Sequence, residues 1–319
     1  MRWIKLFSFA LFIMLLSCSG AEVTFEDILD DESEMADSIP VLKRNVLIIG
    51  NSASRDAFSY VPFLFEEAGE NFRINMVILY KGAENLGGHY KRLTTDSPTY
   101  VIDYCKAGSD GKWYSFSDRS ASDVLSEFQW DMVILQDTWT GSKAYNDVSN
   151  RIHGIKNFIY DNYGAFPIAF MIVPPNPKAI KEDDMDAEWK LFSSNAQTLL
   201  VNGLVDYVIP CGTAIQNALH TRLKGLGAYN YLSYEGVHLQ EGLPCLIEAY
   251  TATQSLYSFF GIEKTIESSP LRITQKWVWN KDIPGRHGSV IEGTEQDYDL
   301  CKRCAMAAFN DPYSVTLLQ

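Results

Sequence analysis

The stretch 45–69 (NVLIIGNSASRDAFSYVPFLFEEAG) constrains the fold more than any other part of this chain. It opens with the apolar run VLII, whose β-branched residues are typical of a strand buried on both faces of a sheet. A Gly-Asn pair ends this run. From about Arg55 the apolar residues recur nearer to helical spacing up to Gly69, a residue type that commonly ends helices. The sequence therefore predicts a strand, a tight turn at Ser52 and a helix.

Ser52 has two open interpretations on this stretch alone. Backbone N–H groups at a helix N-terminus are unpaired and favour developing negative charge. A serine in this position can therefore act as a nucleophile if a base reaches it. Serine is also a favoured helix cap, and capping by Ser52 or Ser54 is the simpler interpretation.

The N-terminus has the features of a secretion signal. Arg2 and Lys5 precede an apolar run over residues 6–16, which is too short to span a bilayer. The run ends in Leu-Leu-Ser-Cys, which is similar to a bacterial lipobox and implies cleavage before Cys18 and lipidation of its thiol. The alternative is an ordinary signal peptide that happens to end in cysteine. We predict a lipid-anchored protein of the bacterial cell envelope, at the outer membrane or the cell surface.

The next segment, residues 19–39, contains acidic side chains but neither lysine nor arginine, which predicts a solvated, disordered tether. The whole chain has 27 basic and 40 acidic side chains and a formal net charge of −13 at pH 7. This charge argues against nucleic acid or an anionic membrane surface as the main partner. No segment after Cys18 is apolar for long enough to cross a membrane, so we expect membrane contact only through the lipid anchor.

After the tether, the chain alternates between apolar runs and amphipathic stretches. The predicted strands are 46–49, 73–80, 130–135, 166–173 and 205–210. The predicted helices are 55–69, 120–128, 148–160, 184–201 and 241–260. Strands separated by helices predict a central five-stranded parallel sheet in a three-layer α/β/α domain. Two further runs, 100–104 and 113–116, flank a turn-forming segment and predict an inserted hairpin.

Polar or flexible residues follow three of the predicted strands directly. Ser52, Gly82 and Gln136 each come just after a strand, and sites in parallel sheets lie at the carboxyl ends of strands. The loop before the helix at 241–260 reads LSYEGVHLQ and carries Glu235 and His238 three residues apart. Histidine is the natural general base near neutral pH, and a carboxylate can orient it. A lone histidine is more often structural, but only His238 combines a late loop with a carboxylate three residues before it.

These motifs together resemble the SGNH (GDSL-like) hydrolase superfamily. The shared features are Gly-Asn-Ser at 50–52, a glycine after the second strand, an amide after the third, and acid-x-x-His at Glu235–His238. Within the superfamily, the chain is most similar to an uncharacterised branch of bacterial envelope lipoproteins. The resemblance covers about 45–260 and implies a flavodoxin-like three-layer fold.

The resemblance implies a serine esterase that needs no metal or other cofactor. Ser52 would be the nucleophile, His238 the base and Glu235 the acid that orients the base. The oxyanion would be held by backbone N–H groups of Ser52 and Gly82 and by the side-chain amide of Gln136. Such donors act on charge that appears only in the transition state. Envelope members of the superfamily often remove O-acetyl groups from carbohydrates, so an acylated carbohydrate or another small ester is the expected substrate.

The chain departs from the superfamily pattern in several places. The acid before the histidine is usually aspartate, whereas Glu235 is one methylene longer. The usual Gly-x-Asn-Asp after the third strand is absent, so Gln136 or Asp137 must substitute for it. Asn85, in the loop that contains Gly82, is an alternative oxyanion ligand. These departures leave a second hypothesis open, a catalytically inactive glycan-binding lipoprotein of the same fold.

The chain thus divides into four predicted parts. They are a lipoprotein signal peptide at 1–18, a tether at 19–39, an SGNH-like domain at 40–262 and an extension packed on it at 263–319. The extension contains Trp277 and Trp279, which fit either a half-buried strand or a surface for stacking sugars. We expect a last helix at about 289–307.

Five cysteines remain after Cys18. They are Cys105, Cys211, Cys245, Cys301 and Cys304. The pair Cys301-x-x-Cys304 lacks a second pair at zinc spacing, and in an oxidising envelope a disulfide is the expected use. The odd number leaves at least one free thiol, for which a buried Cys211 or Cys245 is the best candidate.

Overall fold

The computed structural model describes residues 24, 42–69, 71–109, 111–178, 184–281 and 283–318. From residue 42 onward these belong to one compact unit, Asp37–Gln319. The predicted signal peptide with its lipidation site Cys18 lies outside the described residues, as does the predicted tether apart from Thr24.

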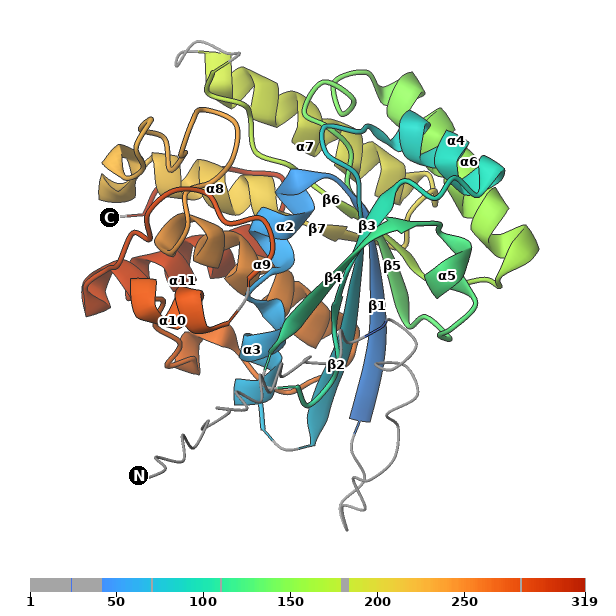
Figure 1. Cartoon of the computed structure of the whole chain (residues 1–319). Helices are drawn as coiled ribbons and strands as arrows, with labels where there is room; N and C mark the ends of the chain where they lie inside the picture. The colour runs from blue at the N-terminus through green and yellow to red at the C-terminus, as the bar shows by residue number, and fades with distance from the viewer. Residues whose placement is uncertain are drawn as a thin grey trace, which may run out of the picture. The chain divides into compact units, whose positions relative to one another are not determined.

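The core is a single sheet of seven strands in the order β4-β3-β2-β1-β5-β6-β7 (Figure 1). The strands are β1 (Leu42–Gly50), β2 (Phe72–Tyr80), β3 (Tyr100–Cys105), β4 (Trp113–Arg119), β5 (Met132–Leu135), β6 (Ile168–Met171) and β7 (Tyr207–Ile209). Strand β1 pairs in parallel with β2 and β5, and β6 and β7 continue the parallel order. These are the five strands predicted from the sequence, and they confirm the α/β class.

The prediction of five strands in total was wrong, because the predicted hairpin joins the sheet. Strand β3 pairs antiparallel with β2, and β4 pairs antiparallel with β3. Tyr100, Ile102 and Tyr104 of β3 are buried. The hairpin thus covers the edge of β2, whose backbone groups would otherwise lack partners, and it buries aromatic surface at the same time.

Helices flank the sheet on both sides (Figure 1). They are α2 (Ser52–Phe58), α3 (Val61–Glu67), α4 (Leu86–Thr95), α5 (Ser122–Leu125), α6 (Tyr145–Asn162), α7 (Met185–Val201), α8 (Cys211–Leu219), α9 (Leu243–Phe259), α10 (Gln275–Asn280) and α11 (Glu295–Asn310). Helix α9 packs against α2, α3 and α8, whereas α4 packs against α6. Every residue of α9 from Leu243 to Tyr257 is buried, so α9 is a central helix of its layer.

The predicted helix over 55–69 is two helices, α2 and α3. Pro62 stands in the first turn of α3. Proline has no N–H and fits only the first turn of a helix, so the chain begins a new helix there instead of continuing α2. Helices α4 and α8 were not predicted from the sequence. Helix α8 follows β7 directly and is buried along its whole length, including the polar side formed by Thr213, Gln216 and Asn217.

The segment after α9 packs on the domain through α11, which contacts α8 and α9. The expected strand around Trp277 is instead helix α10. The Trp277 ring packs edge-on against Tyr60 and Phe63, with ring centroids 5.6 Å and 4.6 Å apart. Trp277 therefore attaches the extension to α3, and the side chain of Trp279 lies outside what the structure describes.

The expectation of a disulfide was wrong for the described residues. All five described cysteines are free and buried. Cys301 and Cys304 lie in the middle of α11 and are fully buried, so both behave as small apolar side chains of the core.

Candidate active site

Ser52 is the first residue of α2 and follows the turn that ends β1. The cap of α2 is Asn51, whose side-chain oxygen accepts a hydrogen bond from Ala53 N at 3.1 Å. Ser54 lies within the helix and donates its hydroxyl to the side chain of Gln136 at 3.0 Å. The capping role considered for Ser52 or Ser54 therefore belongs to Asn51, and the Ser52 hydroxyl is left for another partner.

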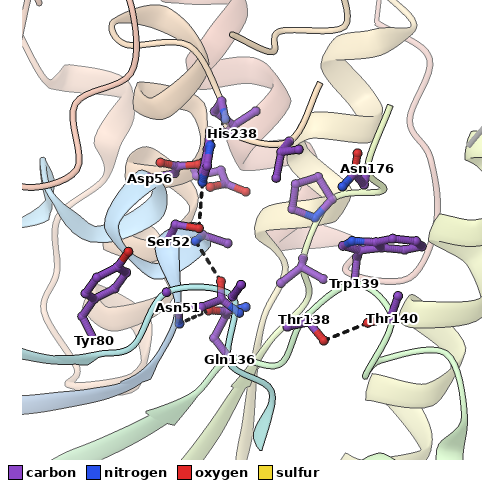
Figure 2. Close-up of a pocket in the computed structure, with 18 residues that line it drawn as sticks. Asn51, Ser52, Asp56, Tyr80, Gln136, Thr138, Trp139, Thr140, Asn176 and His238 are labelled. Atoms are coloured by element: carbon purple, nitrogen blue, oxygen red, sulfur yellow. Dashed lines mark hydrogen bonds between the residues drawn. The ribbon is translucent and has the colours of Figure 1, made fainter. Parts of the chain in front are cut away.

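That partner is His238, which reaches Ser52 from the loop before α9 (Figure 2). Ser52 Oγ lies 2.8 Å from His238 Nε2, and His238 Nδ1 lies 2.5 Å from Glu235 Oε1. The His238 side chain is 20% exposed and the Glu235 side chain is 46% exposed. The hydroxyl, the imidazole and the carboxylate are thus in contact in the order found in serine hydrolases, and the carboxylate end is open to solvent.

A tight turn brings the carboxylate of Glu235 back to the ring of His238. Gly236, within this turn, has φ +84°, a conformation that glycine adopts without strain. A Cβ at Gly236 would lie 2.7 Å from Lys178 Cβ, so a larger residue would also collide with the neighbouring loop. Tyr234 N donates to His238 O at 2.9 Å and closes the turn. The contact between the Glu235 carboxylate and the His238 ring therefore depends on a glycine at position 236.

Two of the predicted oxyanion donors, Ser52 and Gly82, line the same pocket. Neither backbone N–H has a hydrogen-bond acceptor among the described residues. Gly82 lies in the loop after β2, so the carboxyl ends of β1 and β2 bring the two N–H groups to one edge of the sheet. Both residues thus line the pocket, and the structure records no acceptor for either N–H group within the part of the chain that it describes.

Gln136 also lies in the wall of this pocket, but its side-chain amide is already engaged. Its Oε1 accepts hydrogen bonds from Asn51 N at 2.8 Å and Ser54 Oγ at 3.0 Å, while its Nε2 donates to Asp137 O. Gly50 leaves room for this arrangement, since a Cβ there would lie 2.6 Å from Gln136 Oε1. The side chain of Gln136 thus braces the turn between β1 and α2, and at most one of its N–H bonds is left for a ligand.

The alternative oxyanion ligand, Asn85, is the N-cap of α4. Its Oδ1 accepts a hydrogen bond from Gly88 N at 3.0 Å, and it is not one of the described residues that line the pocket. The preceding residue, Glu84, has its backbone oxygen bonded to Asn51 Nδ2 at 3.1 Å. This bond fixes the loop that contains Gly82 to the turn at the start of α2.

Asp137, the other substitute considered for the superfamily's third motif, is a buried anchor. Its Oδ1 accepts from Leu86 N at 3.1 Å and from Thr138 N at 2.8 Å, and its Oδ2 lies 3.2 Å from Arg151. Burial raises the pKa of the Asp137 carboxyl, against the opposing effect of these hydrogen bonds and of Arg151. Asp137 thus connects the loop after β5 to the start of α4.

Two side chains at the site were not predicted from the sequence. Asp56 lies one turn after Ser52 on α2, and its Oδ2 accepts a hydrogen bond from Leu239 N at 3.1 Å. His287, in the C-terminal extension, stacks on His238 with ring centroids 3.9 Å apart and planes 11° from parallel. The four-residue spacing from Ser52 was a usable signal for Asp56. No local pattern marks His287, because only the folded chain brings the extension to the site.

The site opens into a pocket of about 440 Å³. Trp139, Thr140 and Asn176 stand across this pocket from Ser52 and His238 (Figure 2). Apolar side chains, among them those of Val173, Pro174 and Val237, complete the wall. A mostly apolar pocket with a few polar groups beside a nucleophile is typical of a small-molecule site.

Within the described residues, no group of three or more His, Cys, Asp or Glu side chains is placed to hold a metal ion. In the same part of the chain, no helix combines the length and the apolar character needed to cross a membrane.

No family model and no curated protein matches this chain. Among solved structures, a DUF4886 family protein from Bacteroides uniformis has a TM-score of 0.70 at 18% identity, over 87% of this chain and 98% of that one. This chain shares that protein's fold. LAE5, an alpha/beta hydrolase enzyme from the metagenome of Lake Arreo, has a TM-score of 0.44 at 11% identity, over 71% of this chain and 99% of that one. Est24, a carbohydrate acetylesterase from Sinorhizobium meliloti, has a TM-score of 0.31 at 14% identity, over 53% of this chain and 84% of that one.

Proposed function

We propose that this protein is a serine esterase with Ser52 as nucleophile, His238 as base and Glu235 as the orienting acid. The observation that carries this proposal is the continuous contact from Ser52 Oγ to His238 Nε2 and from His238 Nδ1 to Glu235 at the edge of an open pocket. A serine that only supported the fold would need neither the base nor the pocket. The resemblance to SGNH hydrolases, noted from the sequence motifs, agrees with this assignment.

In the first half of the proposed reaction, Ser52 Oγ attacks the ester carbonyl while its proton passes to His238 Nε2. Negative charge then develops on the carbonyl oxygen, and we assign its stabilisation to the backbone N–H groups of Ser52 and Gly82. One well-placed donor of this kind is worth roughly 10²–10³ in rate. His238 gives its proton to the departing alcohol, and an acyl group remains on Ser52.

In the second half, water replaces the alcohol. His238 Nε2 takes a proton from the water as its oxygen attacks the acyl carbon, and the same N–H groups hold the oxyanion. The bond to Ser52 Oγ then breaks and His238 returns the proton to it. Glu235 keeps the Nδ1 proton of His238 in place and stabilises the imidazolium in both halves.

For the substrate, we propose an O-acylated carbohydrate, with a small acyl group such as acetyl. Trp139 in the pocket wall is a flat ring of the kind that sugars pack on, with Lys143 Nζ over it at 4.6 Å from the centroid. Thr140 and Asn176 add polar groups that can bond hydroxyls. Trp139, Thr140 and Asn176 lie across the pocket from Ser52, and we place the alcohol part of the ester on this side.

We also propose that Cys18 carries a lipid anchor that holds the protein in the bacterial cell envelope. The support is the order of charge, apolar run, small residue and cysteine in the sequence. Metabolic labelling with a palmitate analogue tests the anchor, because Cys18→Ala should lose the label and fail to enter the membrane fraction.

Hydrolysis of a panel of p-nitrophenyl esters by the protein without its leader tests the proposed activity. Ser52→Ala and His238→Ala should each lower kcat by roughly 10⁴-fold or more, because the members of such a chain act as a unit. Wild-type inactivity on these esters and on acetylated oligosaccharides, with retained glycan binding by calorimetry, would favour the alternative of a binding protein. The observation that favours this alternative is the half-exposed side chain of Glu235, because water can compete for the carboxylate that orients His238.

A further inference from the structure

The ring of His238 is held on one face by a second histidine. His287 lies parallel to it, with ring centroids 3.9 Å apart and an angle of 11° between the planes. His287 also lies near Tyr234, with ring centroids 6.5 Å apart and planes 25° from parallel. The ring next to His238 therefore comes from the C-terminal extension, and it is itself near an aromatic residue of the loop that carries His238.

The segment that carries His287 is fixed to the end of the same loop. His287 O accepts a hydrogen bond from Glu241 N at 3.2 Å, and Glu241 O accepts one from Ile291 N at 2.8 Å. Gln240 Nε2 donates to Ser289 O at 2.7 Å. These bonds pair the segment around His287 with the residues that follow His238, so the stacked ring is attached to the loop it supports.

Asp56 connects this arrangement to the helix of the nucleophile. Its Oδ2 holds Leu239 N, next to His238, and its Oδ1 lies 3.6 Å from His287 Nε2. Asp56 Oδ1 and His287 Nε2 are both buried, and neither has a hydrogen-bond partner among the described residues. The two atoms face each other just beyond hydrogen-bond distance, so a small closing movement would join them.

The base needs this support because Glu235 alone restrains it weakly. The Glu235 side chain is 46% exposed, so water competes for its carboxylate, and its single contact at Nδ1 does not prevent the ring from tilting. A ring stacked on the face of His238 opposes such tilting. Burial, followed by the nearby charge of His238, lowers the pKa of His287 to about 4, so near neutral pH the stacked ring adds no positive charge beside the imidazolium.

We propose that His287, with Asp56, is a positioning residue of this active site: it holds the ring of His238 in the plane that reaches Ser52. The C-terminal extension would then be part of the catalytic apparatus and not only a cover for the fold. This inference rests on the proposed esterase activity, because positioning has meaning only for a base that works.

The test compares His287→Ala, His287→Phe and a matched control, His153→Ala, in the purified protein. His153 is an exposed histidine of α6, and its Nε2 lies 3.0 Å from Asn157 Nδ2. Loss of the stack in His287→Ala should lower kcat roughly 10- to 100-fold with little change in KM, since small misplacements of catalytic groups cost rates of this order. His287→Phe keeps a flat ring and should recover most of the loss, and His153→Ala should match the wild type.

A spectroscopic readout separates positioning from loss of folding. The ring current of His287 should shift the carbon-bound protons of His238 upfield in the NMR spectrum. This shift should vanish in His287→Ala and persist in His287→Phe, with melting temperatures recorded for both. An active wild type with unchanged kcat in His287→Ala, or a Phe variant as slow as the Ala variant, would overturn the inference alone. A wild type that hydrolyses no ester overturns the proposed function and the inference with it.

Discussion

Gln136 Oε1 accepts a hydrogen bond from the backbone N–H of Asn51 at 2.8 Å, which joins the end of β5 to the residue that precedes Ser52. The same oxygen accepts the hydroxyl of Ser54. Asn51 in turn caps α2 and holds the loop after β2. The positions of Ser52 and of the loop with Gly82 therefore depend on one buried amide.

Gln136→Met should lower stability and activity together. The substitution leaves the buried N–H of Asn51 and the hydroxyl of Ser54 without an acceptor, at a cost of about 1–3 kcal/mol for each unsatisfied group. Thermal unfolding and ester hydrolysis measured on the same preparation check this. A large fall in kcat at unchanged melting temperature would instead show that Gln136 acts directly on the oxyanion.

Glu235→Gln should lower kcat by roughly 10²–10⁴-fold and leave KM nearly unchanged. The amide oxygen of glutamine can still accept a hydrogen bond from His238 Nδ1–H. It carries no negative charge, however, and so it cannot stabilise the imidazolium that forms in the transition state. Steady-state kinetics at low ionic strength check the change. Glu235→Asp serves as the companion variant, because it keeps the charge and shortens the reach by one methylene. Full activity in Glu235→Gln would remove Glu235 from the proposed mechanism.

Arg55→Met should destabilise the fold by about 3–5 kcal/mol, the usual result of leaving a buried charge without its partner. The guanidinium of Arg55 contacts both carboxylate oxygens of Asp103, at 2.7 Å and 3.0 Å, and lies over the Tyr80 ring. Chemical denaturation of the single variants and of the double variant Arg55→Met/Asp103→Asn measures the coupling. The double variant should be more stable than Arg55→Met alone, and simple addition of the two losses would show that the pair is not coupled.

Glu248→Gln should stabilise the protein increasingly as the pH rises. Glu248 is fully buried on α9, and both its carboxyl oxygens lack a hydrogen-bond partner among the described residues. Burial, and next the negative charge of Asp56, raises its pKa well above the usual value. Below about pH 4 the carboxyl is protonated in both the folded and the unfolded state, so the folded state carries no penalty for burying a charge. As the pH rises towards and through the raised folded-state pKa, the unfolded state loses its proton more readily, and the free energy of unfolding falls.

The free energy of unfolding, measured by denaturant titration from pH 4 to pH 8, checks this prediction. The difference between Glu248→Gln and the wild type should be small at pH 4 and favour the variant at pH 8. Glu263→Gln, at an exposed position, should follow the wild type across the range. A variant that is less stable than the wild type at pH 8 would contradict the sign.

The local pattern of the sequence determined the α/β class and the five parallel strands, because each buried strand reads as a short apolar run between turn residues. It also selected Ser52, Glu235 and His238 for the candidate site, since strand ends in a parallel sheet meet at one edge. The structure brings these three side chains into contact. Pro62 is a local signal too, since proline in the first turn of α3 marks the division between α2 and α3.

Only the tertiary structure decided which long-range partners the side chains take. Asn51 rather than Ser52 caps α2, and Gln136 serves the turn more than the pocket, because these choices depend on which donors and acceptors the folded chain brings within hydrogen-bond distance. Whether the five described thiols pair also depends on the tertiary structure, which leaves all of them buried and free. His287 reaches the base because α10 and α11 hold the extension against the domain, and no short-range periodicity encodes a contact between segments so far apart in the chain.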